Sequence, residues 1–357
     1  MRSQLAFLAL ILSILGCSSP NSNPMDSAAL LLSISSEQTP TPFTVVATGQ
    51  QAKLDAVEQT ATTNAFCTAL GSFYWEIGDK NGSYGFSSVA GSTNASTSML
   101  IASASKWIWG AYVLQKVGTP GTNEKSYLRM LSNYDNLSDS SCNLTLTVNA
   151  CFTAGPGNDG TNNNNYLDSA NANKYYYNGG HFQAYAALNP SGLTPSLTNF
   201  TRAQLAAEVA NTLFSGSNPG ISYAVPQPAG GVITNASVYA SFLRRILNSD
   251  ITMGSYLGAD PVVTHPDKNP TAAAYSPFRI TATQEETHYS YGHWIEDSTG
   301  NDGSYSSPGK FGFYPWIDPS NSTYGILARY STSGLAYLQS VYCGRLLRKA
   351  FQTGVAQ

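Results

Sequence analysis

ASASKWIWGAYVLQKV, residues 102–117, is the stretch that decides the fold. Its apolar residues recur at helical spacing from Trp107 to Leu114, and Gly118 follows the stretch as a helix stop. We therefore expect one amphipathic helix here, with a serine and a lysine at its start.

The start of this helix carries the pair Ser103 and Lys106. Residues three apart lie on one helix face, and a serine hydroxyl needs a base within hydrogen-bond reach to become a nucleophile. A lysine serves as that base when its surroundings lower its pKa. Ser307 and Lys310 have the same spacing, but Pro308 and Gly309 between them do not suit a helix interior. The alternative role for Ser103 is a helix N-cap.

Other stretches of the chain carry the patterns of regular elements. We expect helices over 54–70, 202–214, 238–247 and 334–351, and strands over 72–77, 311–317 and 324–330. A turn at 78–82 follows the first strand, and residues 318–322 form a hairpin loop between the last two.

The order of these elements predicts a mixed fold in which both ends of the chain build one sheet. A sheet lobe would comprise about 51–102 and 275–357, and a helical, loop-rich lobe about 103–274 would be inserted between its halves.

The N-terminus has the pattern of an export signal. The apolar run from Leu5 to Leu15 is too short to span a bilayer, so residues 1–16 are interpreted as a signal peptide. The residues that end it, Ile14-Leu15-Gly16-Cys17, resemble the lipobox of bacterial lipoproteins, which implies lipidation at Cys17. A plain secretory signal is the alternative. Residues 17–50 would then form a flexible tether and 51–357 the folded domain, lipid-anchored and extracytoplasmic in the bacterial cell envelope.

The charge balance bears on the partners of the protein. Basic residues number 18 and acidic residues 21, and charged residues make up only 11% of the chain. Because no basic stripe exists to neutralise phosphates, we expect no nucleic-acid partner.

The cysteines predict disulfides in an exported chain. After Cys17, four remain, which allows three connectivities. Cys142 and Cys151 bracket a short polar loop, so we pair them and leave Cys67 with Cys343. The alternative is that all four are free buried thiols.

Three segments in this order resemble the β-lactamase-related serine hydrolases, the family of class C β-lactamases, DD-peptidases and certain esterases. They are Ser103–Lys106, the glycine-containing run 228–234 that leads into the helix of 238–243, and the strand end 316–319. The resemblance covers about residues 60–350. It implies an α+β fold, with an antiparallel sheet flanked by helices and an inserted helical lobe, and an acyl-enzyme on Ser103.

The second catalytic element of that family is Tyr-x-Asn, and residues 176–181, YYNGGH, look like it. The resemblance implies that Tyr176 takes part in proton transfer and that Asn178 holds the substrate, with His181 close to the same site. Tyr177 and the run 134–136, YDN, are the alternatives. The cluster is also compatible with a packed wall of tyrosines.

The third element of the family is a Lys-Thr-Gly or His-x-Gly triplet, and counting back from the strand end places it at Ser307-Pro308-Gly309. Ser307 and Gly309 would then contact substrate, and the backbone N–H groups of Ser103 and Lys310 would form the oxyanion hole. The positive residue is absent in this register, which favours a neutral ester or amide over a carboxylate-bearing substrate. Residues 310–312, KFG, are an alternative register that restores a lysine.

The four histidines match no zinc-binding spacing, so we expect neither a metal nor a cofactor. The sequence as a whole predicts an exported serine hydrolase acting on a small-molecule or cell-wall-derived ester, amide or lactam. The alternatives are an inactive binding lipoprotein of the same fold and a penicillin-binding DD-peptidase.

Overall fold

A computed structural model describes residues 49–280 and 284–357, all of which belong to one structural unit, Phe43–Gln357. The expected signal peptide, the lipidation site Cys17 and all but the last two residues of the expected tether lie outside the described residues.

Helices cover much of the described chain. The α-helices are α2 Gln50–Thr63, α3 Ala65–Thr68, α4 Ser105–Val117, α5 Thr122–Tyr127, α6 Val148–Thr153, α7 Gly180–Leu188, α8 Arg202–Leu213, α9 Ala236–Leu247 and α10 Ala336–Thr353. Short 3-10 helices are η1 Ala102–Ala104, η2 Asp139–Cys142, η3 Ser169–Asn171, η4 Thr252–Tyr256 and η5 Pro277–Ile280.

Strands come from both ends of the chain. They are β1 Phe73–Asp79, β2 Ser83–Val89, β3 Met99–Leu100, β4 Tyr175–Tyr176, β5 Ser222–Tyr223, β6 Val232–Thr234, β7 Val262–Val263, β8 Ala273–Tyr275, β9 His288–Tyr289, β10 Trp294–Glu296, β11 Ser304–Ser306, β12 Tyr314–Ile317 and β13 Thr323–Ala328. The expected helices and strands are present with shifts of a few residues at their ends, except that the helix expected over 54–70 is divided at Asn64 into α2 and α3.

One sheet holds the two ends of the chain together. Within the described residues it has eight strands in the order β2-β1-β13-β12-β11-β10-β9-β7, and each pairing in it is antiparallel. The first strand, β1, pairs with the last, β13, so that Trp75 lies opposite Leu327. This arrangement confirms the expected α+β fold. Because β7 joins the same sheet, the expected start of the second sheet segment at residue 275 is too late.

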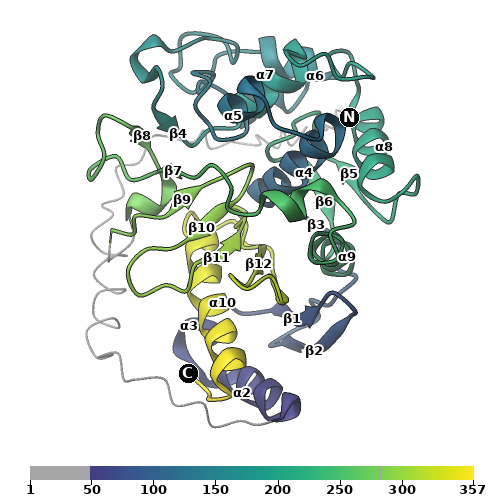
Figure 1. Cartoon of the computed structure of the whole chain (residues 1–357), viewed down its shortest axis with the longest axis vertical. Coiled ribbons are helices and arrows are strands. Elements are labelled where there is room, and N and C mark those ends of the chain that lie inside the picture. Colours follow the sequence, from purple (N-terminus) through teal and green to yellow (C-terminus); the bar gives the residue numbers. More distant parts are fainter. Residues whose placement is uncertain (1–48, 281–283) are drawn as a thin grey trace, which may run out of the picture. The chain divides into compact units, whose positions relative to one another are not determined.

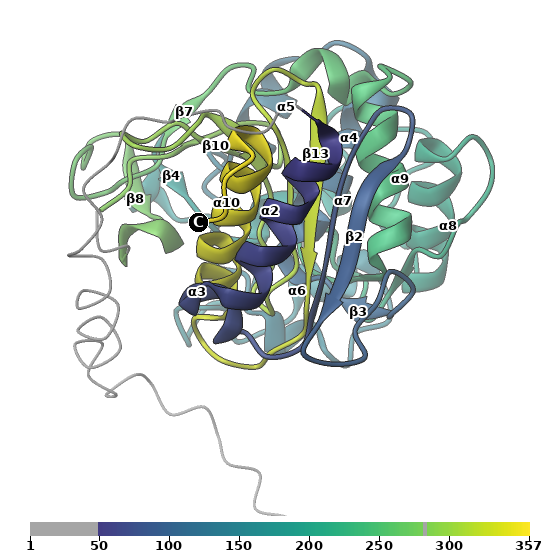
Figure 2. The ribbon, with the colours of Figure 1, turned by 90° about the horizontal axis from the view of Figure 1, so that it is seen from below.

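Helices cover both faces of this sheet. Helices α2 and α10 lie side by side on one face and α9 lies on the other, while α5 to α8 lie in the part beyond the strands (Figure 1, Figure 2). Helix α4 lies between the sheet and this helical part (Figure 1). The first turn of α4 is therefore at the junction of the two lobes.

Both expected disulfides are present. Cys67 in α3 and Cys343 in α10 are bonded, and Cys142 in η2 is bonded to Cys151 in α6. The first bond joins α10 to α3, the short helix that follows α2. The second bond fixes the loop between η2 and α6.

A buried ionic network attaches α10 to the sheet. Glu296 of β10 is 1% exposed and accepts hydrogen bonds from Arg345 Nε and Arg348 Nη2, each at 2.9 Å. The two guanidinium groups hold the pKa of this carboxyl well below its usual value, to about 2, against the opposing effect of burial. Because removing one partner would leave a buried unpaired charge, this network constrains where α10 lies.

The two disulfides should differ in their contribution to stability. The Cys67–Cys343 bond encloses 276 residues and the Cys142–Cys151 bond only 9, and a longer loop loses more entropy on closure. Replacing Cys67 and Cys343 by alanine together should therefore lower the free energy of unfolding by about 2–5 kcal/mol. The Cys142→Ala, Cys151→Ala variant should lose less in the same urea titration, and an equal or larger loss would contradict this explanation.

Candidate active site

Ser103 and Lys106 lie together at the start of α4. Ser103 is in η1 and partly exposed, and Lys106 is in the first turn of α4, where its Nζ donates a hydrogen bond to Ser103 Oγ at 3.0 Å. The structure thus brings together the two side chains that the Ser-x-x-Lys spacing placed on one face.

The glycine-containing run 228–234 holds this turn in position. Val232 O accepts from Ile101 N at 3.0 Å, and Val232 N donates to Ser105 Oγ at 3.2 Å. From α9, which follows the run, Tyr239 Oη donates to Ala104 O at 2.9 Å. The segment therefore clamps the residues on both sides of Ser103.

Lys106 is buried without an acidic partner. It is 5% exposed, its Nζ donates to Ala229 O at 2.9 Å, and no carboxylate of the described residues lies within ion-pair distance of it. Burial lowers the pKa of the Lys106 ammonium from 10.5 to about 8, while the more distant Asp139 carboxylate acts in the opposite direction. About a tenth of Lys106 is therefore neutral at pH 7, far more than for an ordinary lysine.

Tyr177 completes the group around Ser103. The Ser103 hydroxyl and the Trp294 indole are both hydrogen-bonding neighbours of the Tyr177 phenol, and Lys106 Nζ lies 4.9 Å from the centre of its ring. Burial raises the pKa of Tyr177 to about 12, more than those two hydrogen bonds lower it. Tyr177 is therefore a phenol at neutral pH.

Tyr176, which the sequence favoured, does not contact Ser103 among the described residues, and Tyr177 takes the expected place. The ring of Tyr176 packs on Tyr275 with their centres 5.3 Å apart, because neighbouring residues of an extended segment point to opposite sides. Of the two tyrosines that the Tyr-x-Asn resemblance offered, the structure thus brings Tyr177, the alternative, to Ser103.

The side chains of Asn178 and His181 form hydrogen bonds within the protein. Asn178 Oδ1 accepts from Leu137 N at 3.2 Å and its Nδ2 donates to Leu137 O at 3.1 Å, so its amide binds the backbone of the neighbouring loop. His181 is fully buried, with Nδ1 at the Ser132 hydroxyl and Nε2 at Tyr176 O. Burial lowers the pKa of His181 to about 3. Both side chains thus have partners within the protein, and their contact with substrate stays a prediction.

The rival run 134–136 also has a structural role. The ring of Tyr134 stacks on Tyr127, with centres 6.1 Å apart. Asn136 donates to Asn163 O at 3.0 Å and accepts from Asp159 N at 2.8 Å. These side chains order the loop after residue 154 and are not part of the Ser103 group.

The residue before Ser103 has an unusual backbone conformation. Ala102 has a φ of +45°, which lies in the left-handed region. A residue that carries a side chain has a higher free energy in this region. Ser103 follows in the first turn of a short helix, where backbone N–H groups have no partner within the helix. This geometry suits a serine whose N–H binds an oxyanion.

The end of β11 approaches Ser103 through Ser307. Ser307 Oγ donates to Ser103 O at 3.0 Å, so this side chain positions the nucleophile segment. Ser307 N and Gly309 N both donate to carbonyls of the facing chain, at Pro315 and Phe313.

No contact of the described residues tests the expected second oxyanion donor, the Lys310 N–H. Ser307 N and Gly309 N donate to the facing chain, so the N–H groups at 308 and 310 would point away from it, and Pro308 has no N–H. Lys310 is exposed in the turn that Gly309 and Gly312 close. The assignment of the Lys310 N–H to the oxyanion hole stays a prediction, together with that of the Ser103 N–H in the first turn of η1.

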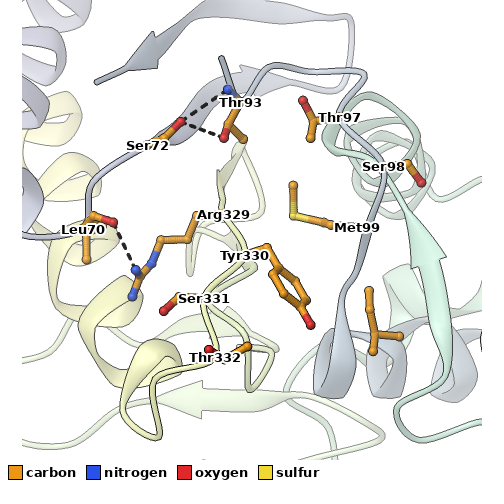
Figure 3. A pocket seen from close by; sticks show the side chains of 11 residues that line it. Leu70, Ser72, Thr93, Thr97, Ser98, Met99, Arg329, Tyr330, Ser331 and Thr332 are labelled. Carbon is orange, nitrogen blue, oxygen red and sulfur yellow. Dashed lines mark hydrogen bonds between the residues drawn. The ribbon is translucent and has the colours of Figure 1, made fainter. Parts of the chain in front are cut away.

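A separate cavity of about 830 Å³ lies around Arg329, and none of the catalytic candidates lines it (Figure 3). Arg329 is buried and donates to the carbonyls of Leu70 and Ala336. Its neighbour Tyr330 lines the cavity with several serine and threonine side chains (Figure 3). Arg329 therefore joins β13, α10 and the segment before β1.

The described residues show neither a metal-binding cluster nor a membrane-spanning helix. They contain no group of three or more histidine, cysteine or acidic side chains arranged to hold a metal ion. No helix among them is both long enough and apolar enough to cross a membrane.

Several solved structures share this architecture. A protein from Bacteroides dorei DSM 17855 that was assigned as a β-lactamase is 16% identical, with a TM-score of 0.57 over 84% of this chain and 98% of that one. EstCE1, a hydrolase with promiscuous acyltransferase activity, is 9% identical, with a TM-score of 0.54 over 85% and 100%. D-amino acid amidase from Ochrobactrum anthropi SV3 is 9% identical, with a TM-score of 0.53 over 84% and 98%.

At these identities the likeness concerns the fold. No family model matches the sequence, and no curated protein does. The chain therefore has the fold of the serine β-lactamases and penicillin-binding proteins, as the sequence motifs implied.

The close contact between α4 and the turn before β10 should be essential to this site. A Cβ on Gly292, where φ is +85°, would overlap the carbonyl oxygen of Lys106. Gly292→Ala should therefore displace the first turn of α4 and lower the free energy of unfolding by about 3 kcal/mol. Gly300→Ala is the matched control, because φ is +90° there and the space is open, so only backbone strain of about 1–2 kcal/mol is expected. Equal losses for the two variants in urea titrations would contradict the packing argument.

Proposed function

We propose that this protein is a serine hydrolase that forms an acyl-enzyme on Ser103 with an ester or amide substrate. The observation that supports this most is the 3.0 Å contact between Ser103 Oγ and the buried Nζ of Lys106. A lysine whose pKa lies near 8 is basic enough to take a proton, and about half of it is neutral at pH 8. A purely structural lysine needs no partly exposed serine beside it.

The first step forms the ester bond. Neutral Lys106 accepts the proton of Ser103, whose Oγ attacks the carbonyl carbon of the substrate. The carbonyl oxygen becomes negative and accepts a hydrogen bond from the Ser103 N–H. When the bond to the leaving group breaks, Tyr177 donates a proton to the departing atom and regains one from the Lys106 ammonium.

The second step releases the acyl group. Water attacks the acyl carbon and gives a proton to neutral Lys106, and the carbonyl oxygen again becomes negative. The bond to Ser103 Oγ then breaks, and Ser103 regains its proton from Lys106. The free acid leaves, and every proton transferred in the cycle is restored.

The altered third triplet supports a neutral ester or amide over a β-lactam or a peptidoglycan stem. Those ligands carry a carboxylate, and this strand end offers Ser307, Pro308 and Gly309 where a lysine or histidine would bind it. The similar structures include a hydrolase and an amidase of D-amino acids, which is compatible with acyl transfer on this fold. Export and lipid attachment at Cys17 belong to the same proposal and rest on the N-terminal sequence.

Labelling with a fluorophosphonate, read by intact-mass spectrometry, tests the nucleophile. We expect one adduct on the folded protein, none on Ser103→Ala, and a loss of ester turnover of at least about a thousandfold in that variant. Ser105→Ala is the matched control, because Ser105 lies in the same turn but binds Val232 N, and it should still be labelled.

The result also separates the alternatives. Absence of any adduct on the folded protein would favour the binding protein without turnover. A stable adduct with penicillin in a parallel sample would favour the DD-peptidase.

The pH dependence of the reaction should report Lys106. Below about pH 8 the lysine is protonated and cannot act as base, so kcat/KM for a neutral ester should rise with pH and level off above about 8. Tyr177, with a pKa of about 12, should produce no loss up to pH 10. A rate that still rises tenfold per pH unit between 9 and 10 would show that Lys106 keeps its ordinary pKa and is not the base.

A further inference from the structure

Asp139 is an exposed carboxylate attached to the same turn that holds Lys106. Its Oδ1 accepts a hydrogen bond from Gln227 Nε2 at 2.8 Å, and Gln227 is 4% exposed. Two residues further on, Ala229 O holds the Lys106 ammonium. The carboxylate is thus positioned by the protein beside the catalytic group.

The segment that carries Asp139 is fixed on both sides. Before it, the Leu137 backbone is bound by Asn178, the residue after Tyr177. After it, Cys142 is held by its disulfide with Cys151. Asp139 therefore has a defined place relative to Tyr177 as well as to Lys106.

The groups around Ser103 carry a net negative charge when Lys106 is in its neutral, reactive form. Asp139 is the carboxylate whose field reaches both Lys106 and Tyr177. Among the described residues it forms no ion pair. In the state that attacks, Lys106 is neutral and Tyr177 is a phenol, so Asp139 carries the formal charge among these three groups.

We infer that Asp139 selects substrates that carry a cationic group, so that the substrate class is an ester or amide bearing an ammonium. An ammonium near Asp139 gains Coulomb energy at a partly exposed site, and a carboxylate there is repelled. The inference rests on the proposed function, because it concerns the substrate of the same Ser103 site. It also gives a physical reason for the absence of a lysine or histidine in the triplet 307–309.

Three 4-nitrophenyl esters of matched length test this inference: that of an ω-amino acid, that of the corresponding fatty acid, and the monoester of the corresponding dicarboxylic acid. The unaltered protein should have the highest kcat/KM for the ammonium ester and the lowest for the carboxylate ester. In Asp139→Asn the ratio of ammonium to neutral ester should fall by about two- to fivefold, mainly through KM. Asp139→Glu should restore much of it.

Two controls separate recognition from other effects. Asp250 is also exposed, but its charge is not among the causes that shift the pKa of Lys106 or Tyr177. Asp250→Asn removes the same charge as Asp139→Asn and should leave the ratio unchanged. Because Asp139 raises the pKa of Lys106, Asp139→Asn should also shift the pH profile downward, but equally for all three esters. Ratios measured at one pH therefore report recognition alone.

The outcomes are distinct. An unchanged ratio in Asp139→Asn, with turnover of the neutral ester intact, overturns this inference and leaves the proposed hydrolase standing. Failure of the unaltered protein to turn over any of the three esters, together with no phosphonate adduct, overturns the proposed function and this inference with it.

Discussion

The burial of the Lys106 ammonium is the constraint on which the site depends. A cation removed from water is costly unless it is paired, and here its hydrogen-bond partners are the Ser103 hydroxyl and the Ala229 carbonyl. The cost is reduced when the lysine gives up its proton, which is the property a general base needs. The same contact therefore explains both the lowered pKa and the activation that we propose for the serine.

The rest of the fold can be understood as the frame that keeps this lysine buried. The run that ends in β6 and Tyr239 both form hydrogen bonds with the segment at the start of α4. One side of α4 packs closely against Gly292 of the turn before β10. Strands β1 and β13 join the two ends of the chain in one sheet, and the Cys67–Cys343 bond joins α3 to α10. The catalytic turn thus lies between elements that are far apart in sequence.

Sequence patterns predicted the structure correctly where it depends on the spacing of residues within one helix or strand. A separation of three residues places Ser103 and Lys106 on one face, and alternation together with turn residues located the two hairpins. In YYN, at residues 176–178, the pattern failed, because consecutive tyrosines are equivalent in a sequence and a shift of one residue reverses which side each faces. Asp139 was missed for a different reason: its place depends on Gln227, 88 residues away, and no local pattern shows that contact.

A crystal structure of the protein after reaction with a fluorophosphonate would test this account most directly. We predict a covalent bond from phosphorus to Ser103 Oγ and a phosphonyl oxygen at the Ser103 N–H. Lys106 Nζ and Tyr177 Oη should lie within hydrogen-bonding distance of the bonded oxygen atoms. Phosphorus on any other residue, or a bonded Ser103 with Lys106 displaced from it and Tyr176 in place of Tyr177, would contradict the account.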